Sequence, residues 1–567
     1  MLEFKREEKL DNTIEVLKKR LRIYSAIRLV LGISFLVFII SLISIGSLTF
    51  VILSIVSFIL LLGFMLYTNK FYQEEAHLKK KKLIYTLHKK RRTLEYGSFH
   101  DTGSDFLNKE DYKLADLDLF GKKSLFQYLN SAKTRLGRSY LAKSLIEGND
   151  KDLAYTNCIY KLANSEDTLD IEADIDEFSA DAKHLDYDEF TSVLGKKIEF
   201  KPIFFLPLLS FIATIIFAIL IPVLKINPLF ILIFLVLNLL SVRVLNNEAF
   251  LLNSNAYENI CDAYIRVSRT IANIDLDDEY YNSLKTIISE ELPNLLKVKG
   301  IYSTLSCRKN AIFNLGLNTL CIVDFWILLR YNRINNEALR LNELFESVAE
   351  IECMISLANI GMDNEVYSIP KVGSEIEGID MYHPLVKGCI ANSITVNGGI
   401  ILTGSNMSGK TTFMRTLGIN QILANAKGLV PAKSFTSPNL KVFTSLRAND
   451  MLSEGVSTFY AEILRMKKIN EAIVGDKCLI LIDEIFKGTN AYERITASRK
   501  VIEKLNSYNA FFIISTHDFE LCDTEGIINY HFAEHYNDDK IGFDYILKDG
   551  KCESKNALYL LKMSGII

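Results

Sequence analysis

Residues 404–411 have the types and spacing of a phosphate-binding loop. They match the pattern G-x-x-x-x-G-K-[ST] and follow a short apolar run. Glycines let backbone N–H groups wrap a phosphate, and the N-terminus of the helix expected next adds partial positive charge. The ammonium of Lys410 would reach the β- and γ-phosphates, and the hydroxyl of Thr411 would bind Mg²⁺. The sequence therefore predicts a site for ATP and Mg²⁺ formed by Gly404, Ser405, Asn406, Met407, Ser408, Gly409, Lys410 and Thr411.

Two later apolar runs end in residues that suit phosphate chemistry. The run 479–482 is followed by Asp483 and Glu484. Asp483 is expected to hold Mg²⁺ through water, and Glu484 to orient or deprotonate the attacking water. The next run ends at His517, whose imidazole is expected to contact the γ-phosphate. With the loop in front of them, these residues predict hydrolysis of ATP, with Glu484 and His517 as the catalytic residues.

The segments that must position these residues differ in amino-acid pattern along the chain. From about residue 377, short apolar runs bounded by glycine alternate with helical stretches. This alternation predicts an α/β domain with buried parallel strands over residues 377–567. Residues 103–200 and 246–360 instead have apolar positions at three- and four-residue spacing with few glycines or prolines, which predicts helices.

Two long stretches without charge predict a membrane protein. Residues 29–69 carry no charged residue, and residues 202–242 carry only Lys225. Because a helix needs about 20 residues to cross the hydrocarbon core, each stretch fits two spans. We expect four transmembrane helices in two hairpins, 27–68 and 202–243, which turn near Gly46-Ser47 and near Lys225.

The positions of lysine and arginine predict the orientation. Basic residues flank both hairpins on the side of the soluble segments, whereas the two turns carry only Lys225. By the positive-inside rule, both termini and every soluble segment face the cytoplasm from the inner membrane. A crossing by the apolar stretch 311–329 would put the later ATP site outside the cell. We therefore expect that stretch to form a buried or amphipathic helix.

Composition agrees with a membrane protein and gives no support for a dedicated nucleic-acid binder. Hydrophobic residues make up 49% of the 567-residue chain, and the mean hydropathy is +0.16. The net charge is −3, whereas nucleic-acid binders usually carry a basic excess. Nine cysteines form no C-x-x-C pair, as expected for reduced thiols in the cytoplasm. The expected divisions are 1–26, 27–68, 69–201, 202–243, 244–376 and 377–567.

The motifs and the text between them resemble the MutS family of DNA mismatch-repair ATPases. Residues 403–412 look like that family's T-G-P-N-M-G-G-K-S-T, and residues 457–462 look like S-T-F-x-x-E. Residues 483–489 resemble D-E-I-G-R-G-T, and residues 515–521 resemble A-T-H-Y-F-E-L. A weaker match at residues 117–138 looks like the start of the family's helical core.

The resemblance implies a fold and partners. It implies an ABC-type P-loop NTPase domain at the C-terminus, preceded by an all-α core of the MutS type that here carries the four transmembrane helices. It also implies a homodimer with composite ATP sites, in which Ser457 of one subunit meets the γ-phosphate held by the other. DNA is a further partner that the resemblance implies, although the net charge does not support it.

The sequence departs from the family pattern at several positions. Ser405 and Ser408 replace a proline and a glycine, and Phe486-Lys487 replaces Gly-Arg. Residues 389–392 lack the aromatic that the family often offers to adenine, which leaves base stacking without an assigned residue. About 28 residues precede the first uncharged stretch, too few for the family's mismatch-reading domain.

Two other functions compete with a MutS-like ATPase that acts on DNA. The ATPase could act instead on a protein, a lipid or a transported solute. For transport, the spans hold Thr214 and Asn238 but no charged residue, whereas transport pathways usually carry ionisable groups. The chain could also be a scaffold that binds ATP without hydrolysis, which the intact Asp483-Glu484 pair disfavours.

Overall fold

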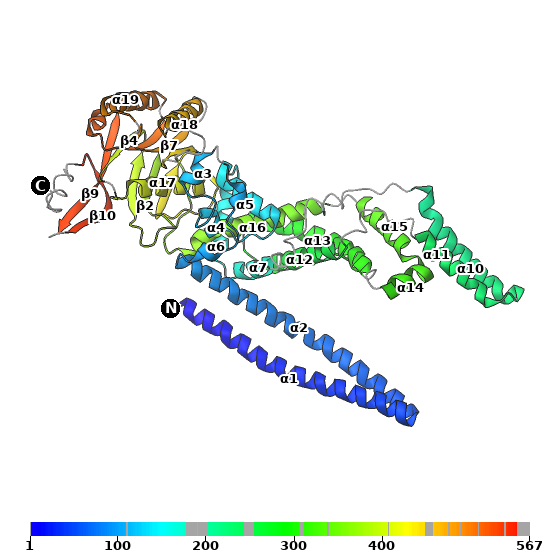
Figure 1. Cartoon of the computed structure of the whole chain (residues 1–567). Helices are drawn as coiled ribbons and strands as arrows, with labels where there is room; N and C mark the ends of the chain where they lie inside the picture. Colours follow the sequence, from blue (N-terminus) through cyan, green and yellow to red (C-terminus); the bar gives the residue numbers. More distant parts are fainter. Residues whose placement is uncertain are drawn as a thin grey trace.

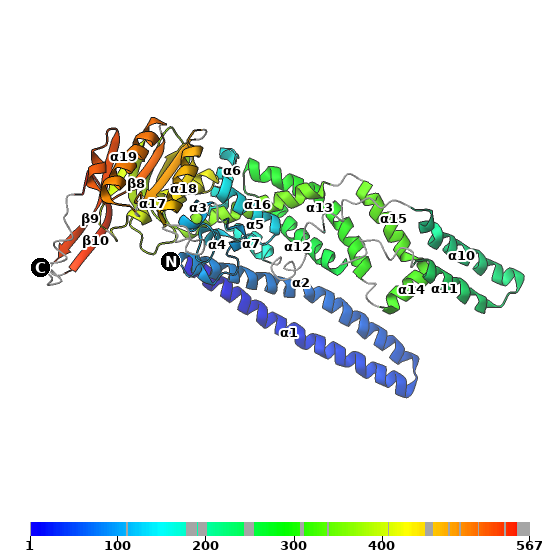
Figure 2. The same cartoon turned by 45° about the horizontal axis from the view of Figure 1, so that its top comes forward.

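The protein is elongated, with an α/β domain at one end, a helical core beside it and the hairpin of α10 and α11 (residues 206–242) at the other end, while the hairpin of α1 and α2 (residues 2–92) runs out alongside the core (Figures 1 and 2). The α/β domain is formed by the C-terminal part of the chain, and the hairpins come from two separate earlier segments. The computed structural model describes residues 2–108, 111–176, 190, 201–242, 254–306, 311–336, 340–405, 407–447, 458–474, 477–486, 489–508, 510–537 and 540–552.

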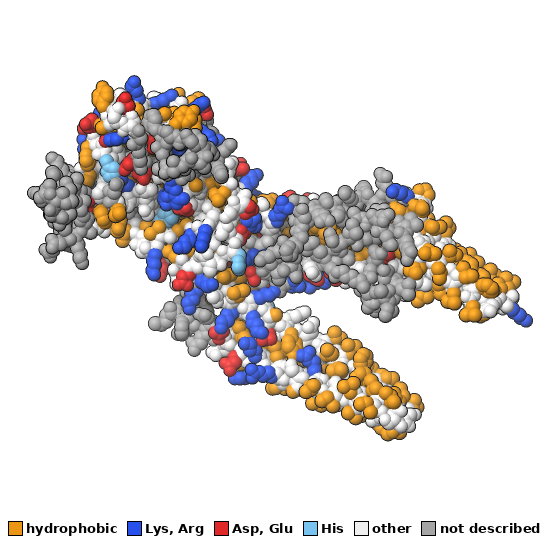
Figure 3. Space-filling model, viewed as in Figure 1, with side chains coloured by type: hydrophobic (Ala, Val, Ile, Leu, Met, Phe, Trp, Pro, Cys, Tyr) orange, Lys and Arg blue, Asp and Glu red, His pale blue; other side chains and the backbone are white. Residues whose placement is uncertain are grey.

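The first hairpin consists of the two longest helices, α1 (Leu2–Ile45) and α2 (Leu48–Arg92). They meet at Gly46-Ser47, the position of the expected turn, and the Ser47 hydroxyl caps α2 by accepting a hydrogen bond from the N–H of Thr49. Each helix is long and apolar enough to cross a membrane. Figure 3 shows hydrophobic side chains gathered around the far half of this hairpin and charged side chains on the half nearer the core.

The second hairpin pairs α10 (Leu206–Leu224) with α11 (Ile231–Val242). Lys225 ends α10 in the left-handed conformation, at φ 52°. The stretch Pro202–Leu224 is long and apolar enough to span a membrane, whereas Pro228–Val242 is apolar but shorter. Of the four expected spans, three therefore have the length and composition of a membrane crossing.

Helix α16 (Leu341–Asp363) forms the centre of the helical core. Most of its residues are buried because other helices surround it. It packs against α5 (Arg135–Glu147), α6 (Leu153–Asn164) and α13 (Glu279–Ser306). The smaller helices and the remaining core helix are α3 (Tyr112–Asp116), α4 (Leu125–Leu129), α7 (Thr168–Ile175) and α12 (Ser254–Asn273).

The apolar stretch 311–329 forms two helices rather than one. Helix α14 (Ala311–Cys321) and helix α15 (Val323–Asn336) are separated at Ile322, which has a φ of 43°. The sequence predicted a buried or amphipathic helix here, and α15 does bury the face that contains Phe325 and Leu328. The break was not predicted, because no glycine or proline marks it.

The C-terminal domain is built on a six-stranded sheet of order β10-β9-β4-β8-β7-β6. Strands β6, β7, β8, β4 and β9 are parallel, and β10 returns antiparallel to β9. Strands β4 and β7 come from apolar runs that are buried on both faces, as central parallel strands should be. The strands are β4 (Gly399–Thr403), β6 (Lys441–Ser445), β7 (Cys478–Asp483), β8 (Phe511–Ser515), β9 (Ile527–Asn537) and β10 (Lys540–Asp549).

Among its described residues, the domain also contains a smaller sheet and the α-helices α17 (Lys410–Asn425), α18 (Thr458–Ala472) and α19 (Ala491–Ser507). The smaller sheet has the order β1-β5-β2-β3. Its strands are β1 (Lys371–Val372), β2 (Ile376–Met381), β3 (Asn392–Val396) and β5 (Ser434–Ser437).

Candidate nucleotide-binding site

The loop between β4 and α17 holds backbone conformations that require glycine at both ends. Gly404 has a φ of 142° and Gly409 a φ of 103°. A Cβ at Gly404 would lie 2.8 Å from the carbonyl oxygen of Phe532 and 2.9 Å from the hydroxyl of Ser408. The loop can therefore pass close to β9 only without a side chain at this position.

The ammonium of Lys410 points back into this loop. Lys410 is the first residue of α17 and is only 5% exposed. Its Nζ donates hydrogen bonds to the carbonyl oxygens of Gly404 (2.7 Å) and Ser405 (2.9 Å). A buried ammonium at the N-terminus of a helix suits an anion such as a phosphate.

Thr411 and Asp483 form the oxygen pair expected for magnesium. The Thr411 Oγ1 donates a hydrogen bond to Asp483 Oδ2 at 2.7 Å. Ser515 donates to the other oxygen of Asp483, because Asp483 and Ser515 face each other in the β7–β8 register. The carboxyl ends of β7 and β8 thus hold the acid beside the first turn of α17.

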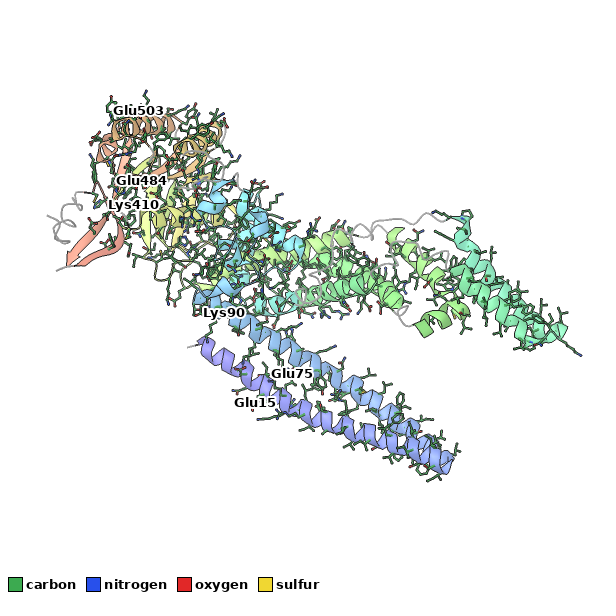
Figure 4. All side chains as sticks on the ribbon, in the orientation of Figure 1. Glu15, Glu75, Lys90, Lys410, Glu484 and Glu503 are labelled. Carbon is green, nitrogen blue, oxygen red and sulfur yellow. The ribbon has the colours of Figure 1, made fainter. Side chains whose placement is uncertain are left out.

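Glu484 and His517 come together just beyond the strand ends. Glu484 Oε1 lies 2.9 Å from His517 Nε2, and both side chains are partly exposed. The Glu484 N–H donates to the carbonyl of Ser515 at 3.1 Å. Glu484 and Phe486 both have a positive φ, 58° and 59°, which is costly for residues other than glycine and is often found at functional sites. Figure 4 places Lys410 and Glu484 close to each other in the α/β domain.

A cavity of about 640 Å³ opens over the loop. Its lining includes Lys410, Thr411, Asp483 and Glu484, so the structure brings these expected residues together. Cys389, Ile390 and Asn392 of the stretch 389–392 also line it, and they bring no aromatic side chain. Asn406 and Ser457 lie outside the described residues.

Tyr545 is a residue of the cavity that the sequence motifs did not reveal. It belongs to β10, has a φ of 55°, and lies at an irregularity in the pairing with β9. The Asn392 side chain holds this irregularity, since its Nδ2 donates to the Tyr545 carbonyl (2.9 Å) and its Oδ1 accepts from the Leu547 N–H (2.7 Å). Alternation along 540–549 would predict a strand, but only the sheet order places that strand beside the loop.

The residues present fit a Mg²⁺–triphosphate group. Within the part of the chain that the structure describes, the buried hydroxyls of Ser405 and Ser408 have no hydrogen-bond partner, although they face the loop interior. Such hydroxyls are suited to donate to phosphate oxygens. Thr411 and Asp483 supply oxygen ligands, which Mg²⁺ prefers when phosphate and water complete its shell. No group of three His, Cys, Asp or Glu side chains that could hold a metal alone occurs among the described residues.

A neutral histidine and two paired arginines lie near the start of α17. Burial and, to a smaller extent, the nearby guanidinium of Arg415 lower the pKa of His383 to about 4, so this imidazole stays neutral. Arg415 lies one turn along α17 from the loop and contacts Asp118 at 3.3 Å. Asp118 also accepts two hydrogen bonds from Arg447, which joins the helical core to the α/β domain beside the site.

The chain is similar in sequence to a known protein family over the residues that form this site. Residues 400–566 match the family model for MutS domain V. The DNA mismatch repair protein MutS of Leptospira interrogans serogroup Icterohaemorrhagiae serovar Lai (strain 56601) is 29% identical over 333 residues, which cover 55% of this chain and 38% of that protein. DNA mismatch repair protein MutS 2 of Haloarcula marismortui is 27% identical over 338 residues, covering 53% and 34%. MutS of Clostridium tetani is 31% identical over 256 residues, covering 41% and 29%.

The fold and the matched residues define a protein with a C-terminal α/β domain behind a helical core that carries apolar helices. Residues 400–566 therefore resemble domain V of the MutS family, and the relatives reported above are MutS proteins. The chain spans little more than a third of the length of the first relatives it matches.

Proposed function

We propose that this chain is a membrane-anchored ATPase that binds and hydrolyses ATP at the loop between β4 and α17. The observation that carries the proposal is the meeting of Lys410, Thr411, Asp483 and Glu484 around one cavity at the carboxyl edge of the sheet. Lys410 neutralises phosphate charge, and the loop N–H groups orient the triphosphate. Bound Mg²⁺ would supply electrostatic stabilisation of the phosphates from its place beside Thr411 and Asp483.

The residues beyond the phosphate loop divide the remaining work. The Glu484 carboxylate takes a proton from the attacking water or orients it. His517, 2.9 Å from Glu484, holds this carboxylate, and we expect its imidazole to contact the γ-phosphate. A protein that only bound ATP would not need Glu484 at the end of β7 with His517 beside it.

Two substitutions test the site, and both can be made in the full chain. We expect Lys410→Ala to abolish ATP binding, because it removes the buried ammonium. We expect Glu484→Gln to keep ATP binding and lose turnover, because the amide cannot accept the proton. Glu503→Gln is the matched control: Glu503 is exposed on α19, away from Lys410 and Glu484 (Figure 4). Normal turnover in the Glu484→Gln protein would refute the catalytic assignment.

The active form proposed here is a homodimer with composite ATP sites, completed by Ser457 of the second subunit. The Glu484→Gln protein should trap this form because it holds ATP without hydrolysing it. Light scattering of the detergent-solubilised protein with and without ATP measures the change in mass. A mass that stays at one chain with ATP bound would refute the composite site.

The molecule on which the ATPase acts is tested first with DNA, because the relatives are named DNA mismatch repair proteins. ATP turnover is measured with and without duplex DNA, matched or mismatched, at low and high salt. Salt-sensitive stimulation by DNA supports the family role. Indifference to DNA at low salt supports the alternative, an ATPase that acts on a protein, a lipid or a transported solute, as the net charge of −3 would suit.

The membrane anchor is proposed from the two hairpins. Their apolar ends carry many exposed large hydrophobic side chains, which water would not tolerate as a free surface of this size. Both hairpins extend away from the α/β domain toward the same end of the molecule (Figures 1 and 2). One bilayer can therefore receive both, with the ATPase domain held on the cytoplasmic side of the inner membrane.

A further inference from the structure

Helix α14 is an uncharged helix that is too short to cross a membrane but lies against one of the apolar hairpins. Its sequence is AIFNLGLNTLC. At about 1.5 Å per residue it is roughly 16 Å long, about half of the hydrocarbon thickness. It packs along α11, and both views show it beside that hairpin (Figures 1 and 2). Near its end Leu320 is 61% exposed.

A polar cluster joins α14 to both helices of the second hairpin. The Asn238 Nδ2 donates to the carbonyl of Thr319 at 3.1 Å. The Asn238 Oδ1 accepts from the hydroxyls of Ser210 (2.7 Å) and Thr214 (3.2 Å). Asn238 is fully buried, so these bonds hold α14 at a fixed place on the hairpin. That place is near the base, because Asn238 precedes the end of α11 at Val242 by one turn.

Helix α15 continues from this point with one face inward and one outward. The inner face buries Phe325 and Leu328 against the core. Phe325 packs edge-on against Phe205, with 6.2 Å between ring centres, where the second hairpin begins. The outer face presents Trp326, which is 47% exposed, followed at four and seven residues by exposed Arg330 and Arg333.

We propose that α14 and the outer face of α15 lie in the surface of the bilayer that receives the hairpins. Trp326 sits at the level of the lipid headgroups, where its ring is buried and its N–H reaches polar groups. Arg330 and Arg333 contact anionic phospholipid headgroups. This surface is a third membrane contact in addition to the two hairpins, and it rests on the proposed membrane anchor. Lipid is favoured over a protein partner because α14 is joined directly to the apolar hairpin.

The chain contains one tryptophan, so its fluorescence reports on this position without labelling. The full chain is reconstituted into phosphatidylcholine–phosphatidylglycerol vesicles whose lipids carry bromine near the headgroups or near the bilayer centre. We expect quenching by the shallow bromine to exceed quenching by the deep bromine by about twofold, as for an interfacial tryptophan. Arg330→Ala together with Arg333→Ala should weaken the shallow quenching, and most strongly in vesicles that contain phosphatidylglycerol.

A matched control moves the tryptophan to the other end of the molecule. Trp326→Phe combined with Tyr508→Trp places it on the exposed end of α19, where aqueous acrylamide should quench it and brominated lipid should not. If Trp326 behaves like this control, the proposal is wrong. Quenching by neither reagent would place Trp326 against protein and would also overturn it. Flotation of the vesicles after an alkaline wash tests the anchor separately: a chain that stays with the vesicles while Trp326 is not quenched by lipid refutes only the surface contact.

Discussion

At the scale of single residues, Tyr545 gives the cavity the aromatic face that residues 389–392 do not supply. Stacking of a base on an aromatic ring contributes about 1–3 kcal/mol. We therefore expect Tyr545→Ala to raise the Kd for ATP by about tenfold, with Tyr545→Phe close to the parent. The Kd for inorganic triphosphate, which has no base, should not change. Isothermal titration with both ligands measures the two effects.

The control for this prediction is Tyr508→Ala, which removes an exposed tyrosine of the same domain far from the cavity. Equal weakening of ATP and triphosphate binding by Tyr545→Ala would show that the residue supports the loop rather than the base. This outcome is physically distinct because the Tyr545 ring also approaches Gly409, where an added Cβ would lie 3.1 Å from Tyr545 Cδ1.

The contrast between Tyr545 and Lys410 shows what sequence can predict of this site. Lys410 and Thr411 belong to one contiguous sequence pattern, and this pattern alone predicts the conformation of a phosphate-binding loop. Asp483 and His517 end apolar runs, and parallel strands bring such ends to one edge. Tyr545 depends instead on sheet order and on an irregular register between β9 and β10, which no local pattern records. The contacts of Asp116 could not be predicted for the same reason, because its hydrogen-bond partners lie more than 300 residues away in the sequence.

At the scale of elements, Asp116 joins the short helix α3 to the strand end of β6. It is buried and accepts hydrogen bonds from the Thr444 hydroxyl (2.8 Å) and from the N–H groups of Leu446 (2.9 Å) and Arg447 (3.3 Å). Asp116→Ala would leave these donors buried without an acceptor. We expect the free energy of unfolding to fall by about 3 kcal/mol, measured by denaturant titration of the solubilised chain.

The matched control for Asp116 is Asp111→Ala, on the same short segment. Asp111 is partly exposed and pairs only loosely with Lys113 at 3.5 Å, so its removal should change stability by less than about 1 kcal/mol. Similar losses from the two substitutions would mean that Asp116 contributes no more than a surface acid. A larger loss at Asp116 supports a tight connection between the helical core and the segment that leads to residue 457.

His88 connects three helices, and its charge gives the connection a pH dependence. It lies beyond the apolar part of α2, with Nε2 2.8 Å from Glu172 of α7 and Nδ1 2.9 Å from Asp363 of α16. Burial lowers its pKa, but the two carboxylates outweigh burial and raise the pKa to about 9. Because the folded pKa lies above the ordinary 6.5, the stabilisation is full below pH 6.5 and is lost as pH rises through about 9.

We therefore expect His88→Gln to lower the melting temperature at neutral pH and to flatten its decline between about pH 7 and 10. Thermal unfolding of the solubilised chain across this range measures both effects. His100→Gln, at an exposed histidine, serves as the control. A decline as steep in the His88→Gln protein as in the parent would assign the pH dependence to other groups.

The positions of helices and strands could be predicted where a whole segment is uniformly apolar. They could not be predicted where burial changes along one apolar stretch, as at Ile322. The uncharged stretches predicted both hairpins, and the apolar runs predicted the central strands of the α/β domain. The separation of α14 from α15 at Ile322 follows from tertiary contacts. The Asn318 side chain accepts from the N–H of Asp324 at 3.0 Å, and Phe325 turns inward to meet Phe205. Such contacts leave no periodic signal before the chain folds.

At the scale of the whole molecule, the first hairpin is longer than a membrane requires. Helix α1 has 44 residues and α2 has 45, about 66 Å at 1.5 Å per residue. About 20 residues suffice for the hydrocarbon core, so in the proposed anchor about half of each helix would lie outside the bilayer. In this half the helices pack through Ile14, Leu17 and Leu21 and end at the His88 connection. We therefore propose that the hairpin is a stalk that sets the distance between the bilayer and the α/β domain.

This arrangement predicts which positions are reached from each side of the membrane. Ser47 and Lys225 lie at the two hairpin turns, and Glu503 lies on α19 at the opposite end of the molecule (Figure 4). With a membrane-impermeant maleimide on intact cells, Ser47→Cys and Lys225→Cys should be labelled, and Glu503→Cys only after permeabilisation. The parent chain corrects for native thiols such as the exposed Cys321. Labelling at one turn but not the other would mean that only one hairpin crosses, because two hairpins that enter the same bilayer from the same side must place both turns beyond it.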